Sequence, residues 1–475
     1  MHQYSKHIDG HDWPARRGPR VGPGTFRRNT LIGRGIAAGF IVLALLSPPL
    51  VAQDKTPASA NMSPAHDPVP VAAGVPVKPA QNGQPITIND AVTIFLRQNL
   101  QLVAAKYDVD IVEAEKLTAK LKPDPQISFA ASDVPVAFNT NVFHPGSLDY
   151  GISQTFELGG KRKKRIDVAN ADADVARAQF ETVVWQMTND VKKKFYSVVL
   201  AKSQLDLSLE NQKTFGEIVD HTREVLKLGE ISGLDLQRLE IEKFKFDTDV
   251  ANSERDYQLA LRDLRLVLGG DYRAMNVDVA GDVDYYQPYY FDLSDLRDKA
   301  LAARPDLKAA KLSEKSAIAS IRLQDAQRIP DITVGAGFSQ VSAGGNTYNA
   351  GVSIPIPIHN RNQEERAKAL IQKSKALTDQ QQLTNQVLSD VDKAFVAFEI
   401  QTRRLALYRT GVLTKVNDVQ TLTEFSLKAG ESSILDLLDA IRTRRDTLSG
   451  FYQTLFDYQS ALLDLELATA TPLQK

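Results

Sequence analysis

Apolar residues follow two rhythms along this chain, and the order of the two rhythms occurs twice. In long stretches the apolar side chains lie three or four positions apart, as at Val184, Met187, Val191 and Phe195, which predicts helices that bury one face. In short stretches apolar and polar positions alternate, which predicts β-strands. The predicted helices span about 86–122, 161–228, 233–268, 294–327, 362–427 and 434–468. The predicted strands span about 126–132, 148–158, 331–341 and 347–356.

The two halves of the chain are similar in sequence as well as in pattern. Residues 87–129 align without a gap with residues 292–334, at an offset of 205 (292 − 87). Around the turn between the later helices, residues 227–236 reappear as 428–437, at an offset of 201 (428 − 227). We therefore predict a tandem duplication of a unit of roughly 200 residues, with two copies of one architecture.

Five segments follow from these patterns. Arginines precede the apolar run 36–46, and small residues follow it, which is the order of a secretory signal with a cleavage point after Ala52. An uncleaved anchor is the alternative, the translation start could lie downstream of Met1, and the export route stays open. The predicted segments are a signal peptide (1–52), a Pro/Ala-rich extended tether (53–85), repeat 1 (86–270), an inter-repeat segment at the equator of the helices (271–291) and repeat 2 with a C-terminal tail (292–475).

Composition removes several classes of function. The 57 basic and 58 acidic residues nearly cancel, so bulk charge gives no reason to expect nucleic-acid binding. Cysteine is absent, which excludes disulfides, thiolate metal sites and a catalytic cysteine. The seven histidines show no metal-ligand spacing, and no nucleotide-binding or hydrolase motif is present. We expect no enzyme activity, no cofactor and no fixed metal site, so energy for any transport must come from partners.

The predicted strands have the length of membrane-spanning strands. Strands of about ten residues cross a bilayer when they are tilted. Each chain offers only four of them, and an open sheet edge is not tolerated in lipid, so several chains would have to share one barrel. Three chains would give twelve strands, whereas the helices are too polar for lipid and would extend away from it. Two soluble β-ribbons that cap a coiled coil are the alternative.

The repeated order of helix, hairpin, long helix, turn and helix resembles the TolC-like outer-membrane efflux family over about residues 86–470. The paired turns at 227–236 and 428–440 carry this resemblance most specifically, and residues 154–162 resemble the strand-to-helix junction of the CzcC-like heavy-metal branch. The resemblance implies an α+β membrane protein, a homotrimer with a twelve-stranded β-barrel in the outer membrane. A periplasmic α-helical coiled-coil barrel would continue this barrel.

The resemblance also implies a function and partners. A periplasmic adaptor (a membrane fusion protein) and an inner-membrane pump, expected to be of the RND type, would dock at the helical tip. The chain would then be the passive exit duct of a tripartite efflux system from periplasm to exterior, with heavy-metal cations as the expected cargo. Two alternatives remain: the same duct serving drugs, organic compounds or type I protein secretion, or a soluble periplasmic coiled-coil scaffold or adaptor.

Two aspartates near the second tip turn are the candidate periplasmic gate. Asp436 and Asp439 lie three positions apart and share a helix face, so three-fold symmetry would gather six carboxylates that favour cations and raise one another's pKa values. By resemblance they match the acidic constriction of the family, and Asp235 is the counterpart of Asp436 in the first repeat. The family's best-studied members lock this entrance partly through an arginine where this chain has Ser432, so another latch is expected. The alternative is that these carboxylates simply favour the helix start.

The helix ends carry signals for caps and turns. Thr87 or Asn89 is expected to cap the first helix, and Ser232 the returning helix. Two glycines that follow the long helices are expected to have positive φ angles and to form tip turns. The residues expected to contact the adaptor at these turns are Gly229, Glu230, Gly430 and Glu431.

A dense basic cluster stands where the second predicted strand meets the long helix. It consists of Lys161, Arg162, Lys163, Lys164 and Arg165. Cations at a helix N-terminus oppose the helix dipole, so helix formation does not explain them. We expect them to meet phospholipid phosphates at the membrane interface, and a solvated basic face is the alternative.

Overall fold

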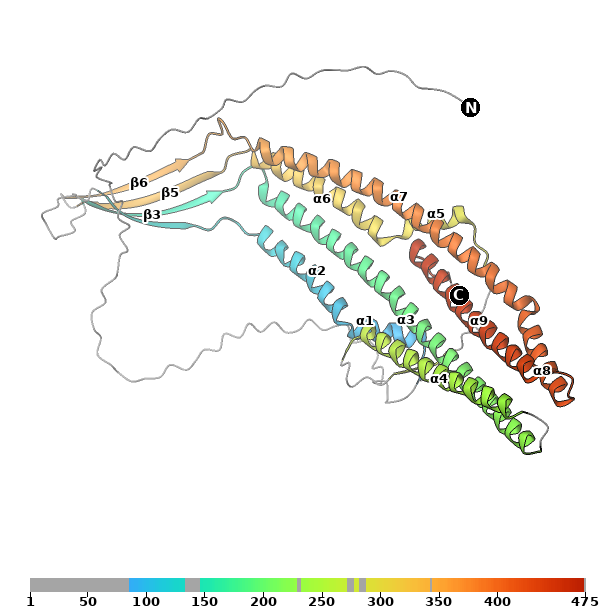
Figure 1. Ribbon diagram of the computed structural model, residues 1–475. Coiled ribbons are helices and arrows are strands. Elements are labelled where there is room, and N and C mark those ends of the chain that lie inside the picture. The colour runs from blue at the N-terminus through green and yellow to red at the C-terminus, as the bar shows by residue number, and fades with distance from the viewer. Residues whose placement is uncertain are drawn as a thin grey trace, which may run out of the picture. The chain divides into compact units, whose positions relative to one another are not determined.

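The computed structural model describes residues 85–132, 146–228, 232–270, 277–281, 288–341 and 344–473 (Figure 1). All of them fall within Val77–Lys475, one of the chain's two compact units. The predicted signal peptide lies outside the described residues, as do all but the last residue of the tether and much of the inter-repeat segment.

The first repeat has the predicted order of elements. It contains β1 (Pro85–Ile86), α1 (Ile88–Gln98), α2 (Leu100–Ala119), β2 (Gln126–Ser132), β3 (Ser147–Phe156), α3 (Lys161–Lys227) and α4 (Gly233–Leu268). The long helix and the returning helix agree with the prediction within a residue. Thr87, rather than Asn89, caps α1, because its hydroxyl accepts from the Asp90 N–H while the Asp90 carboxylate accepts from the Thr87 N–H.

The second repeat follows a short strand, β4 (Asp278–Val279), that pairs in parallel with β1. It contains α5 (Leu293–Ala303), α6 (Pro305–Gln327), β5 (Ile332–Val341), β6 (Gly345–Ser353), α7 (Gln363–Leu407), the π-helix η1 (Tyr408–Val412), α8 (Leu413–Lys428) and α9 (Ile434–Thr469). Among the described residues, no helix is both long enough and apolar enough to cross a membrane.

The prediction of one continuous first helix is wrong in both repeats, and the break falls at equivalent positions. The Asn99 side chain accepts from the Leu102 N–H at 2.9 Å and starts a new helix, α2. In the second repeat Arg304 is extended and Pro305 begins α6. Arg304 is buried against Asp306 and Asp390, at 2.6 Å and 3.3 Å.

The prediction of one helix from 362 to 427 is also wrong. Gly411 has a φ of 109°, and Thr410 also departs from helical angles, so η1 separates α7 from α8. A regular helix does not accommodate a positive φ, which glycine adopts without steric cost.

The helices pack along one another, with α3 in contact with α2, α4, α6 and α9, and with α7 in contact with α6 and α9 (Figure 1). A large apolar core joins both repeats through residues such as Phe95, Val198, Leu264 and Tyr458. A smaller apolar cluster lies nearer the ends of α3, α4 and α9. It consists of Phe215, Val219, Leu239, Phe246, Leu437, Leu438 and Ile441.

The two hairpins form a single antiparallel sheet in the order β2–β3–β5–β6, so β2 and β6 are its edges. The register places Phe129, Tyr150, Phe338 and Tyr348 in one row across all four strands. Their rings lie 5.2, 6.3 and 5.3 Å apart between neighbours, and such cross-strand aromatic pairs stabilise the register.

Candidate functional site

The second tip turn closes as the sequence predicts. Gly430 has a φ of 77°, and its N–H donates to the Leu427 carbonyl at 3.0 Å. The N–H of the exposed Glu431 donates to the Ser426 carbonyl at 2.8 Å, which satisfies a carbonyl at the end of α8. Gly229 and Glu230 of the first tip turn lie outside the described residues.

The candidate gate carboxylates Asp436 and Asp439 are both exposed near the start of α9. Asp436 forms a capping box, accepting from the Ser433 N–H at 2.9 Å and from its hydroxyl at 2.7 Å. These two bonds from Ser433 hold the pKa of Asp436 below its usual range in the single chain. The rise in pKa that we expect from neighbouring carboxylates concerns an assembled ring and stays a prediction.

The other two tip residues singled out by sequence make local bonds. Asp235 is half-buried in the first turn of α4 and forms an ion pair with Arg238 at 3.5 Å. The Ser432 hydroxyl donates to the Thr423 carbonyl of α8 at 3.3 Å. Ser432 therefore closes the helical hairpin formed by α8 and α9. Its hydroxyl does not bridge to the other helical hairpin, which is formed by α3 and α4.

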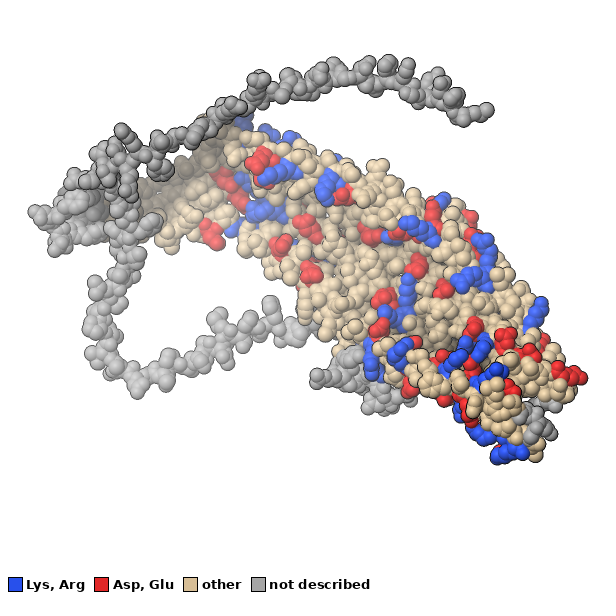
Figure 2. Space-filling view, viewed as in Figure 1, with Lys and Arg blue, Asp and Glu red and all other residues tan. Residues whose placement is uncertain are grey.

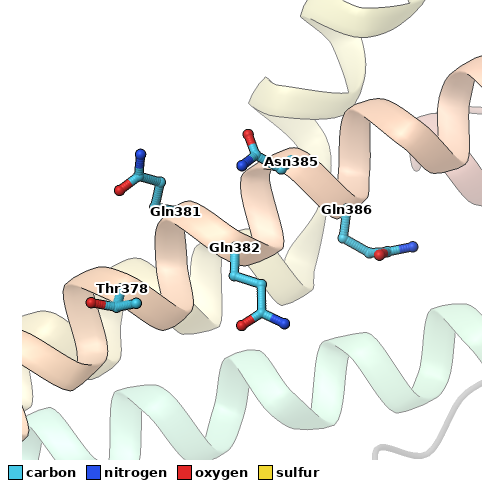
Figure 3. Close-up of a pocket in the computed structure, with 5 residues that line it drawn as sticks. All are labelled: Thr378, Gln381, Gln382, Asn385 and Gln386. Carbon is cyan, nitrogen blue, oxygen red and sulfur yellow. The ribbon is translucent and has the colours of Figure 1, made fainter. Parts of the chain in front are cut away.

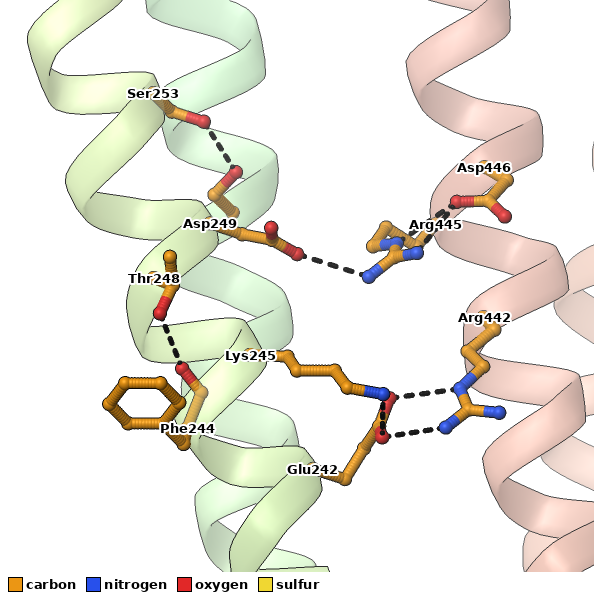
Figure 4. Close-up of polar contacts among 10 residues, drawn as sticks. Glu242, Phe244, Lys245, Thr248, Asp249, Ser253, Arg442, Arg445 and Asp446 are labelled. Atoms are coloured by element: carbon orange, nitrogen blue, oxygen red, sulfur yellow. Dashed lines mark hydrogen bonds and ion pairs between the residues drawn. The ribbon is translucent and has the colours of Figure 1, made fainter.

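Sequence reasoning missed a set of arginines on α9 that bridge the two helical hairpins (Figure 4). Arg442 binds Glu242 of α4 through two parallel contacts, of 2.9 Å and 2.6 Å. The Glu242 side chain is only 6% exposed, and Lys245 adds a third contact at 2.9 Å. The guanidinium of Arg442 is the main reason why the pKa of Glu242 lies below its usual range.

Two neighbouring arginines make similar bridges. Arg445 contacts Asp249 of α4 at 3.0 Å, and its guanidinium lies 5.8 Å from the centre of the Phe246 ring. Arg444 reaches Glu210 of α3 at 2.9 Å. We call Arg442, Arg444 and Arg445, with these carboxylates, the arginine clamp. The arginine-rich run and the seven-residue spacing of Glu242 and Asp249 (249 − 242) were the sequence signals, but only the fold shows that they meet.

The basic cluster at the start of α3 is largely engaged within the chain. Lys161 is buried and lies 2.7 Å from the Asp331 carboxylate, just before β5. Arg165 forms an ion pair with Glu157, and Arg162 donates to the Lys120 carbonyl at 2.6 Å. These bonds join the start of α3 to the end of α2 and to the strand ends.

The remaining two lysines of the cluster are more open. Lys163 is exposed, and Lys164 is half-buried with the Asp167 carboxylate at 3.9 Å. The structure thus divides the five basic residues into three that hold the helix junction and two that are available to an external anion.

The two faces of the four-stranded sheet differ in chemistry, because side chains alternate along each strand. One face, the apolar face, carries mainly Ile127, Phe129, Ala131, Leu148, Tyr150, Ile152, Ile332, Val334, Ala336, Phe338, Tyr348, Ala350 and Val352. The other, the polar face, carries mainly Ser128, Ser132, Asp149, Gly151, Ser153, Thr155, Thr333, Gly335, Gly337, Ser339, Thr347, Asn349, Gly351 and Ser353. Ile127 and Tyr348 are 86% and 85% exposed, so the described part of a single chain leaves the apolar face uncovered.

Most charged side chains lie on the helices and not on the sheet. Side chains of both signs gather near the tips of α4 and α9 (Figure 2). Within the described parts of the chain, no three histidines or carboxylates come together as a metal site would require.

A hollow of about 410 Å3 on α7 does not form a site either. It is lined by Thr378, Gln381, Gln382, Asn385 and Gln386, all from the same helix (Figure 3). None of these side chains is charged, and the figure shows them pointing to different sides of the helix. The helix tips and the sheet therefore remain the candidate functional regions.

Comparisons with known proteins agree with this arrangement. A family model described as outer membrane efflux protein matches residues 92–270 and 296–471. The cobalt-zinc-cadmium resistance protein CzcC of Cupriavidus metallidurans is 24% identical over 372 residues, covering 78% of this chain and 86% of CzcC.

Solved structures share the fold. The transmembrane channel CusC superposes with a TM-score of 0.68 at 18% identity, over 81% of this chain and 92% of CusC. The CmeC outer membrane channel of Campylobacter jejuni gives a TM-score of 0.66 at 15% identity, over 80% of this chain and 85% of CmeC. The chain therefore belongs to the outer membrane efflux protein family: it is a TolC-like protein of the outer membrane whose helices lie in the periplasm.

Proposed function

We propose that three copies of this chain form the passive exit duct of a tripartite efflux system that exports heavy-metal cations from the periplasm. One observation carries the proposal: a four-stranded sheet with an exposed apolar face, a polar face and two open edges is attached to long polar helices. Such a sheet suits a bilayer only if other strands cover its edges.

Trimerisation provides those strands. If β6 of one copy pairs with β2 of the next, three chains make a closed barrel of twelve strands, with the apolar face toward lipid and the polar face toward the lumen. The row of Phe129, Tyr150, Phe338 and Tyr348 then forms part of an aromatic girdle, which is typical of membrane barrels. The helices of the three chains continue the barrel as a periplasmic coiled-coil tunnel.

The cargo assignment rests on charge and on likeness. The similar protein CzcC is named for resistance to cobalt, zinc and cadmium. Asp436 and Asp439 are both exposed at the start of α9, and a three-fold ring of them favours cations at the entrance.

Replacing both Asp436 and Asp439 by alanine is expected to change the conductance and the cation preference of single channels in planar bilayers. Unchanged conductance and cation preference would remove the two carboxylates from the gate.

The arginine clamp serves as the latch that holds the periplasmic entrance closed, a role that Ser432 does not fill. Ser432 bonds within its own hairpin, whereas Arg442 and Arg445 tie α9 to α4 across the two hairpins. Opening of the entrance then requires these pairs to separate and the small apolar cluster at the tips to rearrange. Glu242, being nearly fully buried, is the partner whose separation costs most.

Partners complete the proposed system. The tip turns at Gly430 and Glu431, with Gly229 and Glu230 in the first repeat, serve as contacts for a periplasmic adaptor. An inner-membrane pump of the RND type supplies energy through that adaptor. Lys163 and Lys164 are available to phospholipid phosphates near the membrane.

Deletion of the gene, with survival measured across metals and drugs, tests the cargo. We expect lower tolerance of divalent metals, restored by the full chain. Unchanged metal tolerance together with drug hypersensitivity would assign the duct to organic compounds instead.

Extraction and imaging test the membrane location and the trimer. Release of the protein without detergent would favour a soluble scaffold, and a detergent-solubilised particle without three-fold symmetry would contradict the trimer.

A further inference from the structure

One carboxylate stands apart from the entrance, on the sheet. Asp149 is the single charged residue in the described strands β2, β3, β5 and β6. It lies on the polar face, two residues from the start of β3 and so near the end of the sheet farthest from the helices. A charge in a strand that contacts lipid is costly unless its side chain faces water. Asp149 lies on the face that the proposed barrel turns toward its lumen.

Three serines surround this carboxylate. The Ser132 hydroxyl donates to it at 2.6 Å, and Ser339 and Ser147 hydrogen-bond to it from the neighbouring strand and from β3 itself. Hydroxyl donors stabilise the ionised form and fix its direction. Among the described residues, the groups that hydrogen-bond to the Asp149 carboxylate are serine hydroxyls, and none of them is a cation.

The polar face around Asp149 is hollow and made of small residues. A hollow of about 440 Å3 includes Asp149, Gly151, Gly335, Gly337 and Gly351 among its lining. A side chain at Gly151 would come within 2.5 Å of the Ser128 hydroxyl oxygen, so this part of the face accepts no added bulk without movement. No basic residue of the four strands counters the negative charge of Asp149.

We infer that Asp149 is a specificity-determining residue of the duct: three copies of its carboxylate form an anionic ring in the outer part of the barrel, which draws cations and repels anions. This inference rests on the proposed trimeric duct, because one chain supplies only one carboxylate. The ring is separate from Asp436 and Asp439, which stand at the far end of the helices. The electric field of the carboxylates extends over the screening length of the solution, which is about 30 Å at 0.01 M salt. The effect of the ring on ion permeation is therefore expected to grow as the salt concentration is lowered.

The chain has no cysteine, which allows a test without background reactivity. The variants Asp149→Cys and Tyr150→Cys place a thiol on the polar and on the apolar face. In intact cells, a charged, membrane-impermeant methanethiosulfonate is expected to modify the first variant and not the second. An unreactive thiol at position 149, in protein that still forms trimers, would overturn the inference without depending on channel conductance.

The charge itself is tested in planar bilayers at low salt. For Asp149→Asn, the cation-to-anion permeability ratio is expected to fall about twofold or more, and hexaamminecobalt(III) is expected to block less well from the barrel side only. Asp149→Glu, which keeps the carboxylate, serves as the control that retains selectivity. In the Asp149→Cys variant, a negative reagent is expected to restore the ratio and a positive reagent to lower it further.

The outcomes separate the two proposals. A wild-type trimer that conducts, with selectivity unaffected by Asp149→Asn, overturns the anionic ring and leaves the duct intact. A wild-type protein that neither forms trimers nor conducts overturns the duct itself.

Discussion

Single side chains at the tips decide how firmly the two helical hairpins hold together. Glu242 is almost fully buried, yet its partner Arg442 comes from the other hairpin and is 41% exposed. A buried carboxylate without its cation is strongly unfavourable, so the pair resists separation more than a surface pair does. The adjacent carboxylate Glu240 pairs with Arg223, but this pair joins α4 to α3 within one hairpin and is about half exposed on both sides.

The contrast between these two glutamates gives a prediction. Glu242→Gln is expected to lower the stability of the tip by about 2 kcal/mol, because Arg442 loses a charged partner, and to increase the time that single channels spend open. Glu240→Gln is the matched control, and it should leave channel opening unchanged. Equal opening in the two variants would show that the clamp is not the latch. Planar-bilayer recordings and thermal unfolding in detergent measure both effects.

The same pair is expected to make the helical tip sensitive to acid. Since Arg442 holds the pKa of Glu242 below its ordinary value of 4.5, the ionised carboxylate stabilises the folded tip fully above about pH 4.5. This stabilisation is lost as the pH falls through the lower pKa of the folded state. We expect the difference in unfolding temperature between wild type and Glu242→Gln to be constant near neutral pH and to shrink in acid. A difference that grows in acid would contradict this assignment.

At the scale of elements, the sequence predicted α3, α4, the second tip turn and the four long strands of the sheet, because each has a local signal. Apolar spacing marks α3 and α4, and Gly430 marks the second tip turn. The breaks at Asn99, Arg304 and Gly411 were missed, because apolar spacing continues across them and the cap or positive φ overrides it locally. The arginine clamp was missed for another reason, since it exists only where α9 comes to lie beside α4.

The Asn99 side chain, at the break between α1 and α2, is predicted to stabilise the folded chain. Its side chain caps α2, and its amide donates to the Val267 carbonyl of α4 at 2.6 Å. Asn99→Ala is expected to cost about 1–2 kcal/mol for the cap, with an added cost for the unpaired carbonyl. Asn99→Asp keeps the cap acceptor and loses only the amide donor, so it should fall between alanine and wild type. Asn89→Ala, at an exposed position within α1, should change the unfolding temperature little.

At the scale of the whole molecule, the sheet is the part that is incomplete in one chain. The edges β2 and β6 have no partner strand among the described residues, and the apolar face is exposed. The helices, by contrast, already share a continuous apolar core between the two repeats. Assembly is therefore expected to depend on the sheet more than on the helix core.

Neighbouring residues of β6 allow this dependence to be tested. Ala350 lies on the apolar face and Asn349 on the polar face, because successive side chains of a strand point to opposite sides. An arginine on the lipid side of a membrane barrel costs about 2–4 kcal/mol near the bilayer centre, whereas one in the lumen is solvated. Ala350→Arg should therefore reduce the trimer recovered from the outer membrane, and Asn349→Arg should not. Equal recovery would mean that the apolar face does not contact lipid, and a reversed result would mean that the sheet is oriented the other way round.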